Sequence, residues 1–336
     1  MYKFIVSLLA IGVGLATSVA AQTQWRAGHI GAAGYYTTQA DATLAEEVKA
    51  ATNGKLVITV YPGGTAGYKS PDTLYAISNN LYEMGTVFGS HVAGEEPILE
   101  LFDLPMFVPA DYDFRERLWN AMYPDFAKLL DEKYNVHLIA LFQLEPRMIY
   151  TRKPLQDLAG LRGMKIRAMG PVETSFTQSL GAVPVPVNWT ELYTALQQGM
   201  IDGHWTADVA QHDSKLFEVT NYIYDIGNAG AGSMSLVNKN ALKDLEPQVR
   251  ETFLRLTGEQ HRRRLFDASR AAAERGRKQL VQDGMKPVPV VGQDRAKILT
   301  QVDPIISAWS AKLDPSSKRV YEKARNMIEA YNRGRN

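Results

Sequence analysis

The chain has 336 residues, with 37 Lys and Arg against 36 Asp and Glu, so its formal net charge is +1. Hydrophobic residues make up 45% of the chain, which is enough to fill a large core and excludes an intrinsically disordered protein. The near-zero net charge argues against nucleic-acid binding, because no excess of positive charge would meet the phosphates. The absence of cysteine excludes disulfide scaffolds, thiolate zinc sites and cysteine nucleophiles.

The first 21 residues are typical of a secretory signal peptide. Lys3 is their only charged residue, an apolar run follows over Phe4–Ala16, and the small residues Val19–Ala21 form a cleavage site. The apolar run is shorter than the ~20 residues that a membrane-spanning helix needs, which favours a cleaved signal over an uncleaved anchor. We therefore expect an exported protein that begins at or next to Gln22, in the periplasm if the source is a Gram-negative bacterium.

Strand and helix patterns alternate along the next part of the chain. Expected strands cover residues 25–30, 55–61, 84–88, 136–142 and 164–169, and expected helices cover 40–52, 70–81, 113–134, 171–181 and 190–198. Ser70 is expected to cap a helix that starts at Pro71. This alternation predicts an α/β fold with a mostly parallel sheet that helices cover on both faces. The last third instead predicts long helices, over residues 249–280 and 302–332.

The sequence lacks the motifs of common enzyme classes. It has no Gly-x-Ser-x-Gly, Gly-x-Gly-x-x-Gly, Walker loop or His-Glu-x-x-His. His204, Asp208 and His212 recur at helical spacing and could form a metal site, but unrelated polar residues often share this spacing, so we expect neither a metal nor a cofactor. A secreted hydrolase or lyase that uses His29, His91 or His204 is the alternative function.

Two arginines follow expected strands. Arg167 lies near the carboxyl end of the strand over 164–169, and Arg147 follows the strand over 136–142. Ligands of open α/β sheets bind at the carboxyl ends of the strands, and the planar guanidinium matches a carboxylate with two hydrogen bonds. The alternative is that each arginine pairs with a structural acid such as Glu145.

Four segments carry a specific resemblance in their order along the chain. They are residues 52–64 (with Thr-Asn-Gly-Lys and Tyr-Pro-Gly-Gly), 101–107 (Leu-Phe-Asp-Leu-Pro-Met-Phe), 157–167 (Asp-Leu-Ala-Gly-Leu-Arg-Gly-Met-Lys-Ile-Arg) and 180–203. Together they resemble the substrate-binding proteins of tripartite ATP-independent periplasmic (TRAP) transporters, the DctP-like family. The resemblance covers nearly all of the chain after the signal. It implies a two-lobed, periplasmic-binding-protein-like fold, with the ligand cleft between the lobes and long C-terminal helices.

The resemblance also implies a domain division and a function. Residues 22–144 and about 233–272 are expected to form the first lobe, and 145–232 and about 273–336 the second. A receptor of this kind binds a small organic anion, expected here to be a carboxylate, and delivers it to a membrane permease without catalysis. We expect a monomer. The Lys-Ile-Arg and Pro-Gly-Gly motifs argue against a third hypothesis, a binding protein of an ABC importer.

The family's ligand-binding positions transfer to several residues. Arg167 matches the principal arginine of the Lys-Ile-Arg motif, and Arg147 matches a second arginine, although Glu145 and Pro146 replace the small residues usual before it. Trp205 stands where many relatives carry other residues, and it is expected to cover an apolar part of the ligand. The other candidates are Phe88, Ser90, His91, Thr206, Asn228 and Tyr36. Core packing is an equal alternative for Trp205, Phe88 and Tyr36.

Overall fold

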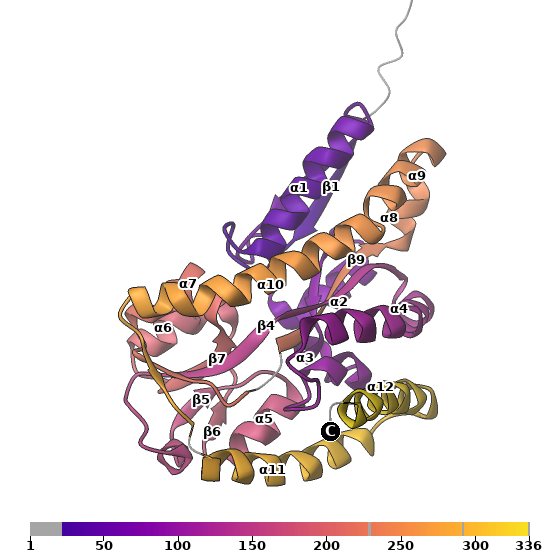
Figure 1. Ribbon diagram of the computed structural model, residues 1–336. Helices are drawn as coiled ribbons and strands as arrows, with labels where there is room; N and C mark the ends of the chain where they lie inside the picture. The colour runs from indigo at the N-terminus through magenta and orange to yellow at the C-terminus, as the bar shows by residue number, and fades with distance from the viewer. Residues whose placement is uncertain (1–21, 228–229, 291, 335–336) are drawn as a thin grey trace, which may run out of the picture.

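The computed structural model describes residues 22–227, 230–290 and 292–334, in which strands and helices alternate as expected (Figure 1). The strands are β1 (Thr23–Gly28), β2 (Leu56–Tyr61), β3 (Met84–Phe88), β4 (Val136–Thr151), β5 (Lys165–Arg167), β6 (Val183–Val185), β7 (Gly203–Ala207), β8 (Tyr222–Tyr224), β9 (Gly230–Asn238) and β10 (Lys286–Val288). The α-helices are α1 (Tyr36–Ala51), α2 (Thr73–Ser78), α3 (Gly89–Val92), α4 (Tyr112–Tyr134), α5 (Gly170–Ser179), α6 (Leu192–Gln197), α7 (Asp208–Asp213), α8 (Lys239–Asp244), α9 (Pro247–Leu256), α10 (Glu259–Gln282), α11 (Gly292–Ser310) and α12 (Pro315–Arg333). Short 3-10 helices add η1 (Ser70–Asp72), η2 (Pro97–Asp103), η3 (Leu158–Leu161), η4 (Trp189–Glu191) and η5 (Leu216–Glu218).

The strands form one sheet in the order β2-β1-β3-β9-β4-β7-β5-β6, and β8 joins β4 to β10. We call β1, β2, β3, β9 and residues 136–146 of β4 the first half-sheet, and residues 147–151 of β4 with β5, β6, β7, β8 and β10 the second half-sheet. The expectation of a mostly parallel sheet is wrong at its centre. Both β4 and β9 run antiparallel to their neighbours: β4 leads the chain from the first half-sheet into the second, and β9 follows β8 and returns it to the first.

Strand β4 is longer than the sequence pattern indicates, since it continues to Thr151 without a break. Its pairing with β9 shifts register between Gln143 and Pro146, and pairing with β7 begins at Arg147. A bulge tolerates a proline, which has no N–H group to donate, and it bends the strand. Pro146 therefore marks the passage between the half-sheets, not the end of a strand.

Two α-helices with clear capping signals, α4 and α12, pack against each other, and α4 also packs on β4. Helix α4 begins after Asp111, whose side chain accepts a hydrogen bond from the Phe114 amide, and it ends at Asn135 in the left-handed conformation. Helix α12 begins at Pro315 after the capping residue Asp314. In Figure 1, α10 runs across both half-sheets, with α1 and α9 near one end and α7 near the other.

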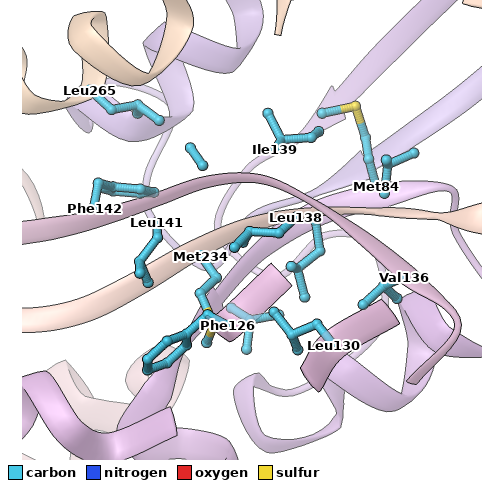
Figure 2. Close-up of a cluster of buried hydrophobic side chains, with 14 of the residues drawn as sticks. Met84, Phe126, Leu130, Val136, Leu138, Ile139, Leu141, Phe142, Met234 and Leu265 are labelled. Atoms are coloured by element: carbon cyan, nitrogen blue, oxygen red, sulfur yellow. The ribbon is translucent and has the colours of Figure 1, made fainter. Parts of the chain in front are cut away.

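The largest core surrounds the first part of β4. Figure 2 shows Leu138 and Leu141 on the side of the strand that faces Phe126 of α4, whereas Phe142 lies on the opposite side, toward Leu265 of α10. A register shift between Leu138 and Ala140 places Leu138 and Leu141 on the same face. Helices thus cover both faces of this strand. None of the described helices is long and apolar enough to cross a membrane.

Candidate functional site

A cavity lies where the two half-sheets meet. It contains about 640 Å³ of empty space, part of it open to solvent. Its walls come from the segment after β1, the β3–α3 junction, β4, the end of β5, η4, the β7–α7 junction and β9. The lining residues are Ile30, Gly31, Ala32, Tyr35, Phe88, Ser90, His91, Leu144, Arg147, Arg167, Trp189, Thr206, Ala207, Ala210, Ser214 and Ala231. Carboxyl ends of strands dominate this list, as expected for a ligand site in an α/β sheet.

Arg167 is the last residue of β5, and its side chain is buried in the cavity wall. Its Nε donates to the carbonyl of Val187 at 3.1 Å and its Nη1 to the carbonyl of Trp205 at 3.5 Å, but its buried Nη2 has no partner. Burial lowers the pKa of Arg167 to about 10, so the group stays charged at neutral pH. A buried cation with an unused N–H group is a binding site for an anionic oxygen.

Arg147 also lines the cavity, but acids already surround it. Its Nη2 lies 2.6 Å from Oε1 of Glu173 on α5, and its Nη1 lies 3.9 Å from Oδ1 of Asp103 on η2. The structural partner is thus Glu173, whereas Glu145 accepts hydrogen bonds from two tyrosine hydroxyls. Both carboxylates line a smaller hollow that shares Arg147 with the cavity.

A cluster of buried acids lies behind Arg147. Glu100 accepts a hydrogen bond from the Val172 amide with one oxygen, and the other oxygen has no partner. Burial raises the pKa of Glu100 to about 9 and that of Asp103 to about 7. The charges of Asp103 and Glu173 also raise the pKa of Glu100, and the charge of Glu173 raises that of Asp103. Glu100 is therefore protonated at neutral pH, which limits the negative charge of the cluster.

Phe88, Ser90 and His91 enter the cavity from the end of β3, as the resemblance implied. The Ser70 hydroxyl forms a hydrogen bond with Nδ1 of His91, so Ser70 does not act as the helix cap expected from the sequence. Burial and the charges of Arg167 and Arg147 lower the pKa of His91 well below its usual value. The ring is therefore neutral at physiological pH and can form a hydrogen bond with a ligand.

Two of the expected site residues have other positions, and a third lies outside the described residues. The ring of Trp205 packs on Phe176 in the core of the second half-sheet, and its Nε1 donates to Thr177 at 3.0 Å, so only its backbone carbonyl reaches the arginines. Tyr36 lies outside the cavity lining and donates its hydroxyl to Glu145 at 2.6 Å. Asn228 lies outside the described residues. Thr206, next to Trp205, does line the cavity.

The sequence reasoning missed Tyr35, Leu144 and Trp189. Tyr35 precedes α1, and its ring packs at a tilt against that of Tyr36. The residue predicted from the sequence, Tyr36, was therefore one position away from the one that lines the cavity. Trp189 follows β6, next to the strand that carries Arg167, and its ring lies 5.8 Å from the Arg167 guanidinium. The rule that ligands bind at strand ends, applied to β6 as well as β5, would have found Trp189.

The histidines do not form a metal site in the part of the chain that the structure describes. His204 binds Gln211 at 2.8 Å, Asp208 pairs with Arg277 at 2.9 Å, and His212 pairs with Asp283 at 2.7 Å. Burial lowers the pKa of His204 to about 3, so its ring is neutral. The remaining histidine that could serve an enzyme is His29, which is buried against Asp41 and does not line the cavity.

Segments that belong to the two sides of the cavity also meet beside it, around a neighbouring hollow that shares Ile30 and Trp189 with the cavity. Lys69, which lines this hollow, forms an ion pair of 3.2 Å with Glu191, and both side chains are more than half exposed. Thr190 packs close to Gly64, in the Pro-Gly-Gly turn after β2. The described conformation is therefore one in which the two sides of the cavity are in contact.

Comparison with known proteins relates the chain to solute receptors. Residues 27–312 match the model of the DctP family, described as bacterial extracellular solute-binding protein, family 7. A solute-binding protein of Roseobacter denitrificans is 27% identical over 53% of this chain and 54% of its own length, so the match spans about half of that relative. The ectoine/5-hydroxyectoine-binding periplasmic protein of Ruegeria pomeroyi is 26% identical over 70% of this chain and 69% of its own length.

Among solved structures, an extracytoplasmic solute receptor of Bordetella pertussis that binds pyroglutamic acid has a TM-score of 0.84 and 28% identity, over 90% of this chain and 99% of that one. The resemblance to TRAP substrate-binding proteins and the two-lobed α/β fold that it implied are confirmed. These proteins are receptors and not enzymes, which decides against the hydrolase or lyase alternative. The chain belongs to the DctP family, the bacterial extracellular solute-binding proteins of family 7.

Proposed function

We propose that this protein is an exported solute receptor that holds a small organic anion in the cavity and delivers it to a TRAP-type membrane permease. The observation that carries this proposal is the buried Arg167, whose Nη2 has no partner in the cavity wall. An uncompensated buried charge is costly, and a carboxylate on the ligand would supply both the opposite charge and the missing hydrogen-bond acceptor.

The relatives support an organic acid as the ligand class. The Bordetella pertussis receptor binds pyroglutamic acid, and the Ruegeria pomeroyi protein binds ectoine and 5-hydroxyectoine. Phe88, Ser90, His91 and Thr206 complete the site around the arginines in our proposal. Trp205 would act there through its carbonyl, by orienting Arg167 and Arg147.

The proposal includes an organisation of the whole chain. Residues 1–21 would be removed during export, and the protein would act as a monomer in the periplasm. The lobe boundaries are those expected from the sequence, with 22–144 and about 233–272 in one lobe and the remainder in the other. The change of partner of β4 at Arg147 supports a boundary near residue 144.

The bound molecule can be identified directly. The protein is purified from the periplasm without added ligand and denatured, and the released small molecules are identified by mass spectrometry. We expect one small organic acid, present at up to one molecule per chain and unchanged after long incubation with the folded protein. A neutral ligand without an acid group, or conversion of the acid into a product, would contradict the proposal.

A further inference from the structure

We propose that the cavity accepts an acid with a single negative charge, and that Glu173 sets this limit by neutralising Arg147. The inference rests on the proposed function of the site and narrows its ligand class. Two guanidinium groups line the cavity, which by itself would suit an acid with two charges. The partners of each guanidinium show that only one of them is available.

Arg147 already has its counter-charge. Oε1 of Glu173 lies 2.6 Å from its Nη2, and Oε2 of Glu173 accepts a hydrogen bond from the Met169 amide at 2.7 Å. Both oxygens of this buried carboxylate are therefore in use, and the pair is fixed at the start of α5. Glu173 lines a smaller hollow behind the cavity, so it neutralises Arg147 without blocking the ligand.

Arg167 differs in having no carboxylate partner in the described residues. Its hydrogen bonds go to the carbonyls of Val187 and Trp205, and neither carries a formal charge. Its Nη2 has no partner at all. One positive charge and the NH2 group of Nη2 thus remain for the ligand, which matches one carboxylate.

The other titratable groups near the arginines leave this balance unchanged. His91 is neutral, because burial and the two arginines lower its pKa. The pKa of Glu173 is raised by burial, against the opposing effects of Arg147, Arg167 and the Met169 amide, and its contact of 2.6 Å with Arg147 is that of an ion pair. Asp103 lies farther from Arg147, at 3.9 Å, and a carboxyl group supplies no positive charge for a second acid group of the ligand.

The rest of the wall offers little to a second carboxylate. Seven of the sixteen lining residues have apolar side chains: Ile30, Ala32, Phe88, Leu144, Ala207, Ala210 and Ala231. A second ionised group would lose its hydration beside these residues without gaining a cation, which is unfavourable for an unpaired charge. A ligand of the same shape with an amide in place of the second carboxylate would lose much less free energy of hydration on entering the cavity.

Isosteric pairs of probes test the charge limit. The probes are succinamate against succinate, glutaramate against glutarate, and phthalamate against phthalate, each pair differing in one ionised group. Thermal shift identifies the pair that stabilises the protein most, and calorimetric titration gives both affinities. We expect the singly charged probe to bind at least about tenfold more tightly than its doubly charged partner, because the second charge has no counter-ion.

The variant Glu173→Gln separates the charge of Glu173 from its shape. The amide still reaches the Met169 N–H, but Arg147 is left with a free charge, so we expect the preference for single charge to fall about tenfold or to reverse. The double variant Arg147→Gln/Glu173→Gln removes that charge again and should restore the preference. The matched control is Glu96→Gln, since Glu96 is also buried and lies 2.6 Å from a cation, Lys133, outside the cavity.

The outcomes distinguish this inference from the proposed function. A doubly charged probe that binds as tightly as its amide, a dicarboxylate recovered from the purified protein, or an unchanged ratio in folded Glu173→Gln would overturn the charge limit and leave the receptor function intact. If no acid of either charge stabilised the protein, the proposed function itself would fail, and the inference with it. If Glu173→Gln does not fold, the wild-type ratio and the charge of the recovered ligand still decide.

Discussion

At the carboxyl end of β5, the Arg167 guanidinium is oriented by two carbonyls, and its Nη2 has no hydrogen-bond partner. We expect Arg167→Ala to weaken binding of the recovered acid by roughly a hundred-fold to a few thousand-fold, since removing one partner of a buried ion pair costs ~3–5 kcal/mol. Arg167→Lys keeps the charge without the fork and should recover part of the loss. Calorimetric titration of the variants measures both effects.

The exposed Arg162 provides the control, because Arg162→Ala removes the same charge outside the cavity and should leave the affinity unchanged. If Arg167→Ala is folded and binds the acid as tightly as the wild type, Arg167 has a structural role only.

The residues found and missed show what a sequence can indicate about a site. Arg167 could be predicted from the sequence because the strand end and the Lys-Ile-Arg motif are both local features. The ring of Trp205 could not be placed, because strand alternation gives two faces without saying which face another helix covers. Helix α5 brings Phe176 and Thr177 against that face, and this packing decides where the ring lies.

At the scale of elements, η2 brings two buried acids to the back of the cavity. The pKa of Glu100 is raised to about 9 and that of Asp103 to about 7, so the folded protein holds protons that the unfolded chain releases. The contribution of these two protonated acids to the free energy of unfolding is fully present below the pKa of an ordinary carboxyl group and is lost as the pH rises toward 9. We therefore expect the melting temperature to fall between about pH 5.5 and about pH 8.5, as far as these acids determine it.

The variant Glu100→Gln tests this contribution. It cannot ionise, so its melting temperature should decline less over the same range than that of the wild type, with a difference in unfolding free energy of at most about 1.4 kcal/mol per pH unit. The exposed neighbour Glu95→Gln is the control and should follow the wild type. Parallel curves for Glu100→Gln and the wild type would show that Glu100 ionises normally.

Strand β4 shows why the elements were only partly predictable. Its first part is a continuous apolar run, which the sequence identifies, but Glu145, Pro146 and Arg147 look like the end of a strand. The strand continues because β9 and β7 lie on either side of the bulge, and this depends on segments more than fifty residues away. Local patterns cannot report such pairing.

Gly230 is the closest contact at this bulge. A Cβ atom there would lie 1.8 Å from the Leu144 carbonyl and 2.5 Å from that of Glu145. We expect Gly230→Ala to destabilise the protein by about 1–3 kcal/mol or more, because two backbones must separate. Gly94→Ala, where nothing lies within 4 Å, should change the stability by less than about 0.5 kcal/mol. Chemical unfolding of both variants compares them, and equal stabilities would contradict the contact.

For the whole molecule, the contacts beside the cavity predict a closing motion driven by the ligand. The Lys69–Glu191 pair is exposed, so it contributes little by itself, and the ligand must supply most of the energy of closure. We expect solution scattering to give a smaller radius of gyration with the recovered acid than without it. Lys69→Ala should change the affinity by less than about fivefold.

The variant Arg167→Ala is the control for this measurement, since it should show no compaction at the same concentration of acid. Identical wild-type curves with and without saturating acid would mean that the sides of the cavity do not move.

The three passages of the chain between the half-sheets, along β4, β9 and α10, also govern the order in which the protein can be assembled. Met84 of β3 pairs with Val237 of β9, and α10, which packs on both half-sheets, is complete only when the chain has reached Gln282. During synthesis, which starts at the N-terminus, β3 and the first part of β4 therefore lack their partner β9 until most of the chain has been made. Such distant pairings form slowly, so we expect the first half-sheet to be completed only after β9 and α10 have been synthesised.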